Sequence, residues 1–327
     1  MNQLINSRSG KRIHGAWYLA YLIFLLISLP VRGQGNTQQP EGQQTVNISG
    51  GKIWYHVIGE GNKLPVLMLH GGPGGTCYSP YALAGISEDR QIILFDQIGT
   101  GRSGIITDTA LMTMEYQVEQ LHEFIEALGL KKFILYGHSW GTMLALDYYL
   151  TYPDGISAMI MNSPLVSTAC WIKDADTLIS TLPDSVQYAI RSNEQKKTYD
   201  DPKYQEANYI YYRHFISRGK RVPNRFGITR APGNNMMYEY MWGPSEFTAT
   251  GTLRNYDRLD RLKEIKVPVL WITGEYDEAR PSTVKYYSSL TPGSVFRVIP
   301  GAAHGTMHDN QEDNINLILE YLSSIKL

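Results

Sequence analysis

Six short apolar runs recur along most of the chain, and three of them end in glycine. The runs are 64–72 (LPVLMLHGG), 90–97 (RQIILFDQ), 133–141 (FILYGHSWG), 156–164 (ISAMIMNSP), 267–274 (VPVLWITG) and 294–300 (SVFRVIP). Continuous apolar runs of this length are typical of strands buried on both faces of a parallel sheet. Ahead of them, 46–59 has near-alternating apolar residues interrupted by two glycines, which predicts a β-hairpin.

Segments with helical periodicity separate these runs. Between 113 and 128, apolar residues recur at three- and four-residue spacing while glutamates take other positions, which predicts an amphipathic helix. A second helix is expected from the end of the 133–141 run to about Tyr152. A closing helix is expected over 309–327, capped by Asp309 or Asn310. Strands alternating with helices predict a doubly wound, mostly parallel α/β sheet.

The pattern changes in the middle of the chain. From about 165 to 253 the sequence is polar, rich in tyrosine and helical in character. The strand pattern returns only at 267. We therefore predict a helical cap, 165–253, inserted into a core formed by 46–164 and 254–327.

The N-terminal segment differs from the rest. Three basic residues precede an uncharged run from Ala16 to Val31, which is short for a membrane span of about 20 residues and resembles a signal-peptide core. We predict that 1–33 is a signal peptide, 34–45 a linker, and the mature protein periplasmic or at the cell surface. A retained N-terminal membrane anchor is the alternative.

Overall composition is that of an ordinary globular protein. The 327 residues include 30 basic and 31 acidic side chains, so the formal net charge of -1 does not suggest a nucleic-acid partner. The only cysteines are Cys77 and Cys170, which fit neither a disulfide framework nor a metal-ligand spacing. Any specificity must come from local chemistry.

The run 133–141 ends in a Gly-x-Ser-x-Gly motif followed by a helical sequence. A serine on a sharp turn from strand to helix projects its hydroxyl above the sheet, and glycines at Gly137 and Gly141 leave room for that turn. Ser139 is therefore the candidate nucleophile.

A serine hydroxyl needs a base to accept its proton and an acid to orient that base. Asp277 follows the run 267–274 and His304 follows the run 294–300, in the chain order typical of the α/β-hydrolase fold. Glu275 is an alternative to Asp277, and His308 is an alternative to His304. The order of Ser139, Asp277 and His304 predicts a catalytic triad.

Acyl transfer also needs two backbone donors for the developing oxyanion. The glycine-rich stretch HGGPGG, 70–75, follows a core strand and offers backbone amides that a substrate can approach. We assign the two donors to Gly72 and to Trp140, the residue after the nucleophile. His70 and Asp96, the latter in the loop DQIGTGRS, are expected to be structural.

Together, HGGPGG, DQIGTGRS, GHSWG, MWGPSEF and GEYDEARP resemble the proline iminopeptidase family of α/β-hydrolases, from about Val46 to the C-terminus. The resemblance implies the same triad and oxyanion hole, and it implies that Glu246 and Glu278 bind the substrate's amino terminus. Two carboxylates suit this role, because they can accept charge-assisted hydrogen bonds from an α-ammonium group. Ile98 departs from the family, in which this loop usually carries arginine.

The sequence thus predicts a serine aminopeptidase that releases N-terminal residues, preferentially proline, from short peptides through an acyl-enzyme. It predicts no metal or organic cofactor. An esterase, lactonase or amidase on the same fold is the alternative, since a triad cleaves whichever acyl group its pocket admits. A non-catalytic binding protein is a more distant alternative, because no triad residue has been lost.

Overall fold

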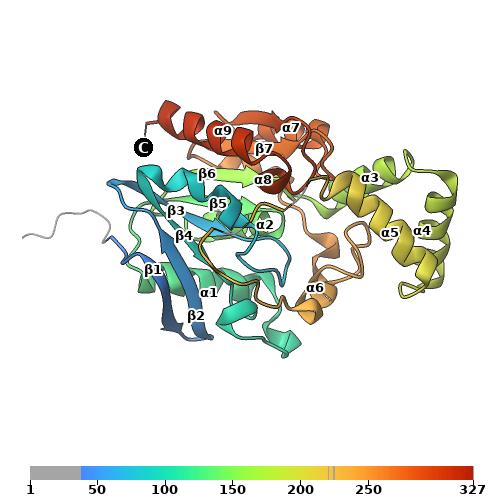
Figure 1. The fold of residues 1–327 in the computed structure, drawn as a ribbon, viewed down its shortest axis with the longest axis horizontal. Coiled ribbons are helices and arrows are strands. Elements are labelled where there is room, and N and C mark those ends of the chain that lie inside the picture. Colours follow the sequence, from blue (N-terminus) through green and yellow to red (C-terminus); the bar gives the residue numbers. More distant parts are fainter. Residues whose placement is uncertain (1–37, 220, 224, 327) are drawn as a thin grey trace, which may run out of the picture. The chain divides into compact units, whose positions relative to one another are not determined.

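The expected strands form one eight-stranded sheet in the order β1-β2-β4-β3-β5-β6-β7-β8 (Figure 1). The computed structural model describes residues 38–219, 221–223 and 225–326, so the signal-like segment 1–33 lies outside the described residues. The strands are β1 (Gly42–Ile48), β2 (Gly51–Ile58), β3 (Lys63–Leu69), β4 (Arg90–Phe95), β5 (Phe133–His138), β6 (Ile156–Asn162), β7 (Val269–Gly274) and β8 (Val295–Ile299). Neighbours among β3 to β8 are parallel, and β1 and β2 are antiparallel. The predicted α/β-hydrolase fold class is confirmed.

Helices cover both faces of the sheet, which explains why the central strands are apolar on both sides (Figure 1). Leu67 and Ile93 point to the face covered by α1 (Met114–Ala127), α2 (Trp140–Thr151) and α7 (Pro281–Leu290). Val66 and Ile92, one residue earlier in each strand, point to the other face, covered by α9 (Gln311–Ser324) and a short 3-10 helix, Pro80–Glu88. The predicted helices after residue 113 and after the serine turn are present.

Four helices lie between β6 and β7 along the chain. They are α3 (Thr168–Ile179), α4 (Asp184–Lys196), α5 (Pro202–Phe215) and α6 (Asn235–Met241). Figure 1 shows α3, α4 and α5 projecting away from the sheet. They share a small apolar core of their own, with Ile190, Tyr204, Tyr211 and Phe247 in its interior. We refer to α3 to α6 and their connections as the cap.

Two local features, the start of β1 and the presence of α7, differ from the expectation, and the structure decides between the two predicted caps of the closing helix. Strand β1 begins at Gly42, inside the stretch predicted as a linker, because an edge strand with one polar face resembles a linker in sequence. The closing helix is capped by Asn310, whose side chain accepts the Asp313 N–H, while Asp309 ends the one-turn helix α8 (Thr306–Asp309). Helix α7, which starts with a proline, was not predicted.

Within the described ranges, no helix combines the length and the apolar composition needed to cross a lipid bilayer.

Candidate active site

Ser139 lies on the sharp turn between β5 and α2. Its backbone has φ 54° and ψ −124°, a strained conformation of the kind that clusters at functional sites. The turn depends on glycine at both flanks, because a Cβ on Gly137 would lie 2.5 Å from the Gly141 carbonyl oxygen. A Cβ on Gly141 would lie 2.4 Å from the Leu69 carbonyl oxygen. The backbone N–H of Ser139 donates to Asn162 on β6 at 3.1 Å, and the residue lines a cavity above the sheet.

Asp277 follows β7 and lies beside His304. Its Oδ1 is 2.9 Å from His304 Nδ1 and accepts the Ala279 N–H at 2.8 Å. Its Oδ2 accepts from the Gly274 N–H and the Thr273 hydroxyl, each at 3.1 Å. Burial alone raises the pKa of this carboxyl, but the His304 imidazole and these donors outweigh burial and lower it below its usual value.

His304 is held through its backbone from both the core and the cap. Its N–H donates to the Phe215 carbonyl at the end of α5 at 3.0 Å. Its carbonyl accepts from His138 Nε2 and from the Ser163 hydroxyl, each at 3.0 Å. Burial, with a smaller contribution from His304, lowers the pKa of His138 to about 3, so His138 is a neutral donor at physiological pH. The edge of Trp171 contacts the His304 ring, with ring centroids 5.6 Å apart.

The two alternative residues have other partners. His308 Nδ1 accepts the Val222 N–H at 3.3 Å, and the exposed Glu275 accepts the Gly301 N–H at 2.9 Å. The structure therefore brings Asp277 and His304 together, and it places Glu275 and His308 away from that pair.

The glycine-rich loop 71–75 packs against the serine turn. A Cβ on Gly71 would lie 3.2 Å from the Ser139 Cβ, and Gly72 has φ +136°, which favours glycine. Gly72 lines the same cavity as Ser139 and His304. Trp140 is the first residue of α2, where backbone N–H groups have no partner within the helix. Trp140 thus directly follows Ser139 in the turn, and Gly72 lines the cavity that Ser139 lines.

Gln97 holds the glycine-rich loop and the serine turn in register. Its side-chain oxygen accepts the Trp140 indole N–H at 2.9 Å, and its amide nitrogen donates to the His70 carbonyl at 3.0 Å. Its backbone N–H donates to His70 Nε2 at 3.0 Å. We had singled out the loop that contains Gln97, but sequence reasoning gave this side chain no role. A polar residue directly after a buried strand was the available signal.

Asp96 and Ile98, the neighbours of Gln97, are buried beneath the site. Asp96 accepts the backbone N–H groups of Cys77 at 3.0 Å and of Arg102 at 2.9 Å, which fits the structural role expected of it. Ile98 lies in the apolar core beside α1 and α2, so the position holds an apolar contact where the family usually has a charge. The Arg102 guanidinium lies 3.5 Å from Asp96, within ion-pair range.

Glu246 and Glu278 lie on the cap side of His304. Glu246 is half-buried, lines the cavity and accepts from the Tyr212 hydroxyl at 2.9 Å. Glu278 is 1% exposed, and its Oε1 is 3.8 Å from His304 Nδ1. Its Oε2 is 3.4 Å from the Tyr211 hydroxyl, and its Oε1 has no hydrogen-bond partner among the described residues. Burial first, then the charges of Glu246 and Asp277, raise the pKa of Glu278 well above its usual value.

Tyr211, Tyr212 and Trp171 support these carboxylates, and sequence reasoning did not single them out. Both tyrosines are on α5, and the Trp171 indole N–H donates to the Glu246 carbonyl at 2.9 Å. Trp171 therefore contacts both the Glu246 loop and His304. A tyrosine-rich cap was the only sequence signal, and it did not distinguish the tyrosines that contact Glu246 and Glu278 from the others.

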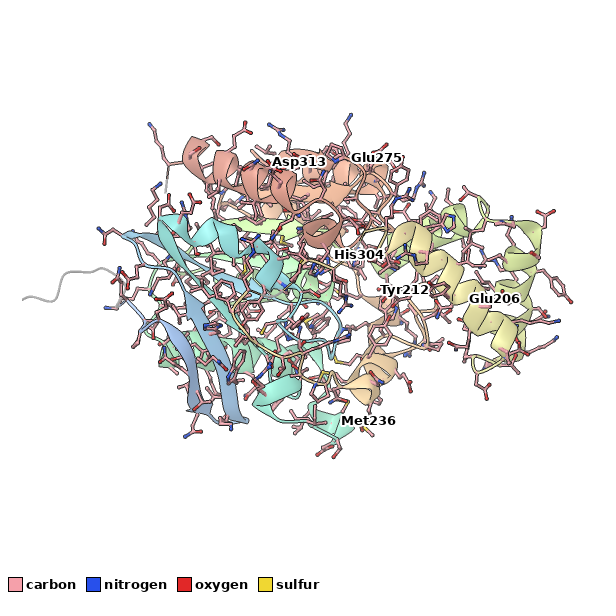
Figure 2. All side chains as sticks on the ribbon, in the orientation of Figure 1. Glu206, Tyr212, Met236, Glu275, His304 and Asp313 are labelled. Carbon is pink, nitrogen blue, oxygen red and sulfur yellow. The ribbon has the colours of Figure 1, made fainter. Side chains whose placement is uncertain are left out.

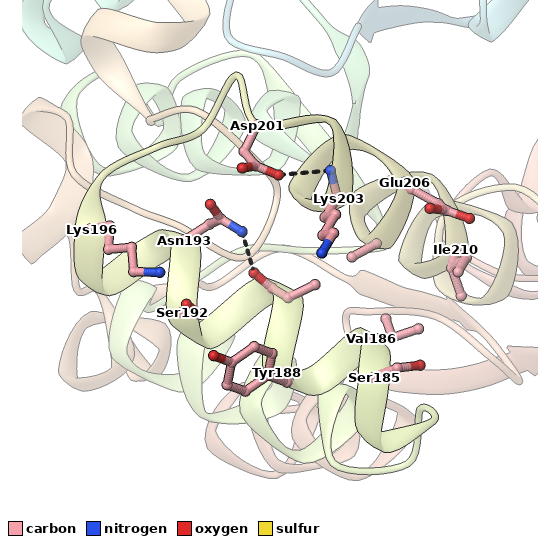
Figure 3. A pocket seen from close by; sticks show the side chains of 12 residues that line it. Ser185, Val186, Tyr188, Ser192, Asn193, Lys196, Asp201, Lys203, Glu206 and Ile210 are labelled. Carbon is pink, nitrogen blue, oxygen red and sulfur yellow. Dashed lines mark hydrogen bonds between the residues drawn. The ribbon is translucent and has the colours of Figure 1, made fainter.

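The cavity lined by Gly72, Ser139, Tyr212, Glu246 and His304 has a volume of about 430 Å³, and the buried Asp277 and Glu278 are not part of its wall. It lies between the glycine-rich loop, the serine turn, the end of α5 and α6. Figure 2 shows His304 beside the start of the cap and Tyr212 on α5 next to it, with Glu206 further out on the cap. A second hollow, of about 550 Å³, lies on the outer side of the cap between α4 and α5 (Figure 3). That hollow contains Lys196, Lys203 and Glu206, but none of the predicted site residues.

The fold and its site match known proteins in sequence and in structure. The α/β hydrolase fold family matches residues 65–311. A proline iminopeptidase of Heyndrickxia coagulans is 39% identical over 284 residues, covering 86% of this chain and 98% of the relative. The crystal structure of a Mycobacterium smegmatis proline iminopeptidase superposes with a TM-score of 0.77 at 28% identity, covering 86% of this chain and 98% of the other. The crystal structure of VinJ superposes with a TM-score of 0.81, also at 28% identity, covering 88% and 100% of the two chains.

Proposed function

The chain belongs to the proline iminopeptidase family of α/β-hydrolases and is a serine hydrolase, and we propose that Ser139, His304 and Asp277 are the catalytic triad with which it removes N-terminal proline from short peptides. The proposal rests on the sequence order of the three residues and on the contact between His304 Nδ1 and Asp277 at 2.9 Å.

In the first half of the reaction, His304 accepts the proton of the Ser139 hydroxyl while Oγ attacks the carbonyl carbon of the first residue. The negative charge that develops on the carbonyl oxygen is stabilised by the N–H groups of Gly72 and Trp140. His304 then gives its proton to the departing amine, and the first residue remains bound to Ser139 as an ester. Water, deprotonated by His304, hydrolyses this ester and releases the free amino acid.

Asp277 does not change its protonation state in this scheme. Its charge stabilises the His304 imidazolium, and its position fixes the imidazole orientation. Because four donors already hold the carboxylate, it stays ionised throughout the pH range in which the triad works.

One observation favours an aminopeptidase over an esterase. Two carboxylates lie on the cap side of the triad, and Oε1 of the buried Glu278 has no hydrogen-bond donor in the described part of the chain. A buried carboxylate without donors is costly, and a bound α-ammonium group would supply the missing positive charge and hydrogen bonds. We propose that Glu246 and Glu278 bind the substrate's free amino terminus.

Three substrates test this function: a free-amine proline arylamide, its N-blocked analogue and a short-chain ester. We expect the free-amine arylamide to have the highest kcat/KM. Preference for the blocked amide or the ester would contradict the aminopeptidase assignment. Glu246→Gln should lower kcat/KM for the free-amine arylamide and leave kcat/KM for the other two substrates unchanged. Glu206→Gln, in the outer hollow of the cap, should change kcat/KM for none of the three substrates.

We further propose, from the sequence alone, that the protein is exported with removal of residues 1–33. Mass spectrometry of the protein from its native host would give the mature N-terminus. A start near Gln34 supports cleavage, and an intact N-terminal segment in the membrane fraction supports the anchor.

A further inference from the structure

The charged residues that line the catalytic cavity are of both signs. Glu246 is acidic, whereas Arg221 and Arg230 are basic, and both arginines come from the connection between α5 and α6. Both are exposed, and neither takes part in an ion pair among the described residues. Two cations at the opening of a cavity that receives a cationic amine require an explanation, because they oppose binding of a simple cation.

The arginines and Glu246 come from different segments of the chain. Arg221 lies beside α8, where the N–H of its neighbour Val222 donates to His308 Nδ1 at 3.3 Å. Arg230 lies in the segment that leads to Asn234, whose N–H donates to the Gly74 carbonyl of the glycine-rich loop at 2.7 Å. The acidic group of the wall, Glu246, comes instead from the loop after α6. The basic and acidic side chains of the cavity wall thus come from different segments, and Ser139 and His304 lie in the same wall.

We propose that Arg221 and Arg230 bind the C-terminal carboxylate of a short peptide substrate, and thereby make the enzyme favour dipeptides and tripeptides. The proposal rests on the proposed function, which sets the amino terminus at Glu246 and Glu278 and the first carbonyl at Ser139. The remainder of the peptide must then extend along the rest of the cavity wall, where the two arginines lie.

The size of the cavity fits a short zwitterion. A volume of about 430 Å³ is near the lower end of the roughly 300–1,000 Å³ typical of small-ligand sites. An extended residue spans about 3.5 Å, so the charged ends of a dipeptide or tripeptide are about 7–10 Å apart. Arginine suits the second end because its planar guanidinium donates two parallel hydrogen bonds to a carboxylate. A longer peptide would carry its carboxylate beyond the arginines.

The test compares peptides that differ only in the terminal group: Pro-Gly with Pro-Gly-amide, and Pro-Gly-Gly with its amide. We expect the purified enzyme to prefer the free acids by about tenfold in kcat/KM, the size of one charge-assisted contact. The preference should shrink as salt is added, because the arginines are exposed. In the double variant Arg221→Gln, Arg230→Gln the acid-to-amide ratio should fall to near one. Arg225→Gln removes an exposed charge from the same connection but lines a different hollow, and should keep the wild-type ratio.

An acid-to-amide ratio near one in the wild type would overturn the proposal, as would a ratio that the double variant leaves unchanged. A preference for Pro-Asp-amide over Pro-Asn-amide without any preference for free acids would also overturn it, because the arginines would then bind an acidic side chain. Hydrolysis of the proline arylamide separates the two proposals. Its absence contradicts the aminopeptidase function, whereas normal arylamide hydrolysis with no acid preference contradicts only the carboxylate site.

Discussion

Asp277 and Glu278 are adjacent buried carboxylates beside His304, but they differ in how well their polar groups are satisfied. Asp277 accepts four hydrogen bonds from the core and from His304. Glu278, the next residue, has one long contact of 3.4 Å to Tyr211 and an Oε1 without a donor among the described residues. The chain itself thus satisfies the Asp277 carboxylate, whereas it leaves Oε1 of Glu278 without a donor among the described residues.

The pKa directions express the same contrast. Both carboxylates are buried, yet the pKa of Asp277 is lowered by His304 and the surrounding donors, and that of Glu278 is raised by burial and by its acidic neighbours. Adjacent residues thus have different roles because one points to the donors at the end of β7 and the other to the cap. The following experiments test that difference.

The largest effect is expected at the nucleophile. Ser139→Ala removes the atom that forms the acyl-enzyme, so kcat should fall by about 10⁴ to 10⁶. A serine-directed phosphonate should label the wild-type protein but not the variant, as followed by intact mass. Ser79→Ala is a matched control that should still be labelled, because Ser79 lines the same cavity but its hydroxyl does not contact Asp277 or His304. Equal labelling of the wild type and Ser139→Ala would exclude Ser139 as the nucleophile.

Asp277→Asn tests the carboxylate whose hydrogen bonds the chain itself provides. The asparagine NH₂ group is a donor that faces either His304 Nδ1 or the backbone N–H groups, so His304 is no longer held in the tautomer that accepts the serine proton. We therefore expect kcat to fall by about 10⁴ on every substrate, whether its amine is blocked or free. The variant should also be less stable near neutral pH. Since the folded pKa is lowered, Asp277 stabilises the fold above its unfolded pKa of about 3.9, and this contribution is lost as pH falls through the lowered value.

Thermal unfolding of Asp277→Asn at several pH values measures that loss. Glu275→Gln is the control, because it removes an exposed carboxylate two residues earlier that does not contact His304. Equal kinetics for Asp277→Asn and Glu275→Gln would remove Asp277 from the triad.

Glu278→Gln should behave in the opposite way towards stability. The pKa of Glu278 is higher in the folded than in the unfolded protein, so the folded state favours the protonated carboxyl. The resulting stabilisation is fully present below the unfolded pKa of about 4.3, and it is lost as the pH rises through the raised pKa. Replacing it with a neutral amide should therefore increase the free energy of unfolding at neutral pH by about 1–3 kcal/mol. Denaturant titration at pH 5 and pH 8 should show the larger gain at pH 8.

The same Glu278→Gln variant should lose about 100-fold in kcat/KM on free-amine substrates, and much less on N-blocked ones. For the wild type, binding of a free amine should improve as pH rises and Glu278 ionises, until the substrate amine itself loses its proton near pH 8. The variant should lack this rise in 1/KM. A wild-type rise that persists in the variant would assign the ionisation to another group.

The sequence was sufficient for the features that depend on local pattern and chain order. The apolar runs predicted β3 to β7 because both faces of those strands are buried, and the last run predicted the edge strand β8, of which only Ile299 is buried. The glycines around Ser139 predicted the serine turn. Asp277 and His304 follow from their positions after β7 and β8, since parallel strands bring their carboxyl ends to one edge of the sheet.

The features that the sequence did not predict depend on contacts between distant segments. Gln97 connects two loops more than forty residues apart, and Trp171 joins the Glu246 loop to His304 from a helix of the cap. Neither contact has a local signature, because polar or aromatic residues at such positions are common. The unequal environments of Asp277 and Glu278 were also invisible, since neighbouring residues look alike until the surrounding donors are known.

The smallest effect is expected for the tyrosines that contact the glutamates. Tyr212→Phe removes a hydroxyl that donates to Glu246 at 2.9 Å, so the carboxylate loses a positioning contact. KM for free-amine substrates should rise about fivefold, the size of an ordinary hydrogen bond, with little change in kcat. Tyr211→Phe removes the 3.4 Å contact to Glu278 but keeps a ring that packs on Phe215 and Phe247, and its effect should be smaller. Steady-state kinetics on free and N-blocked proline substrates measures both. A larger rise in KM for Tyr211→Phe than for Tyr212→Phe would contradict this ranking. It would mean that the long contact from Tyr211 contributes more to amine binding than the shorter contact from Tyr212.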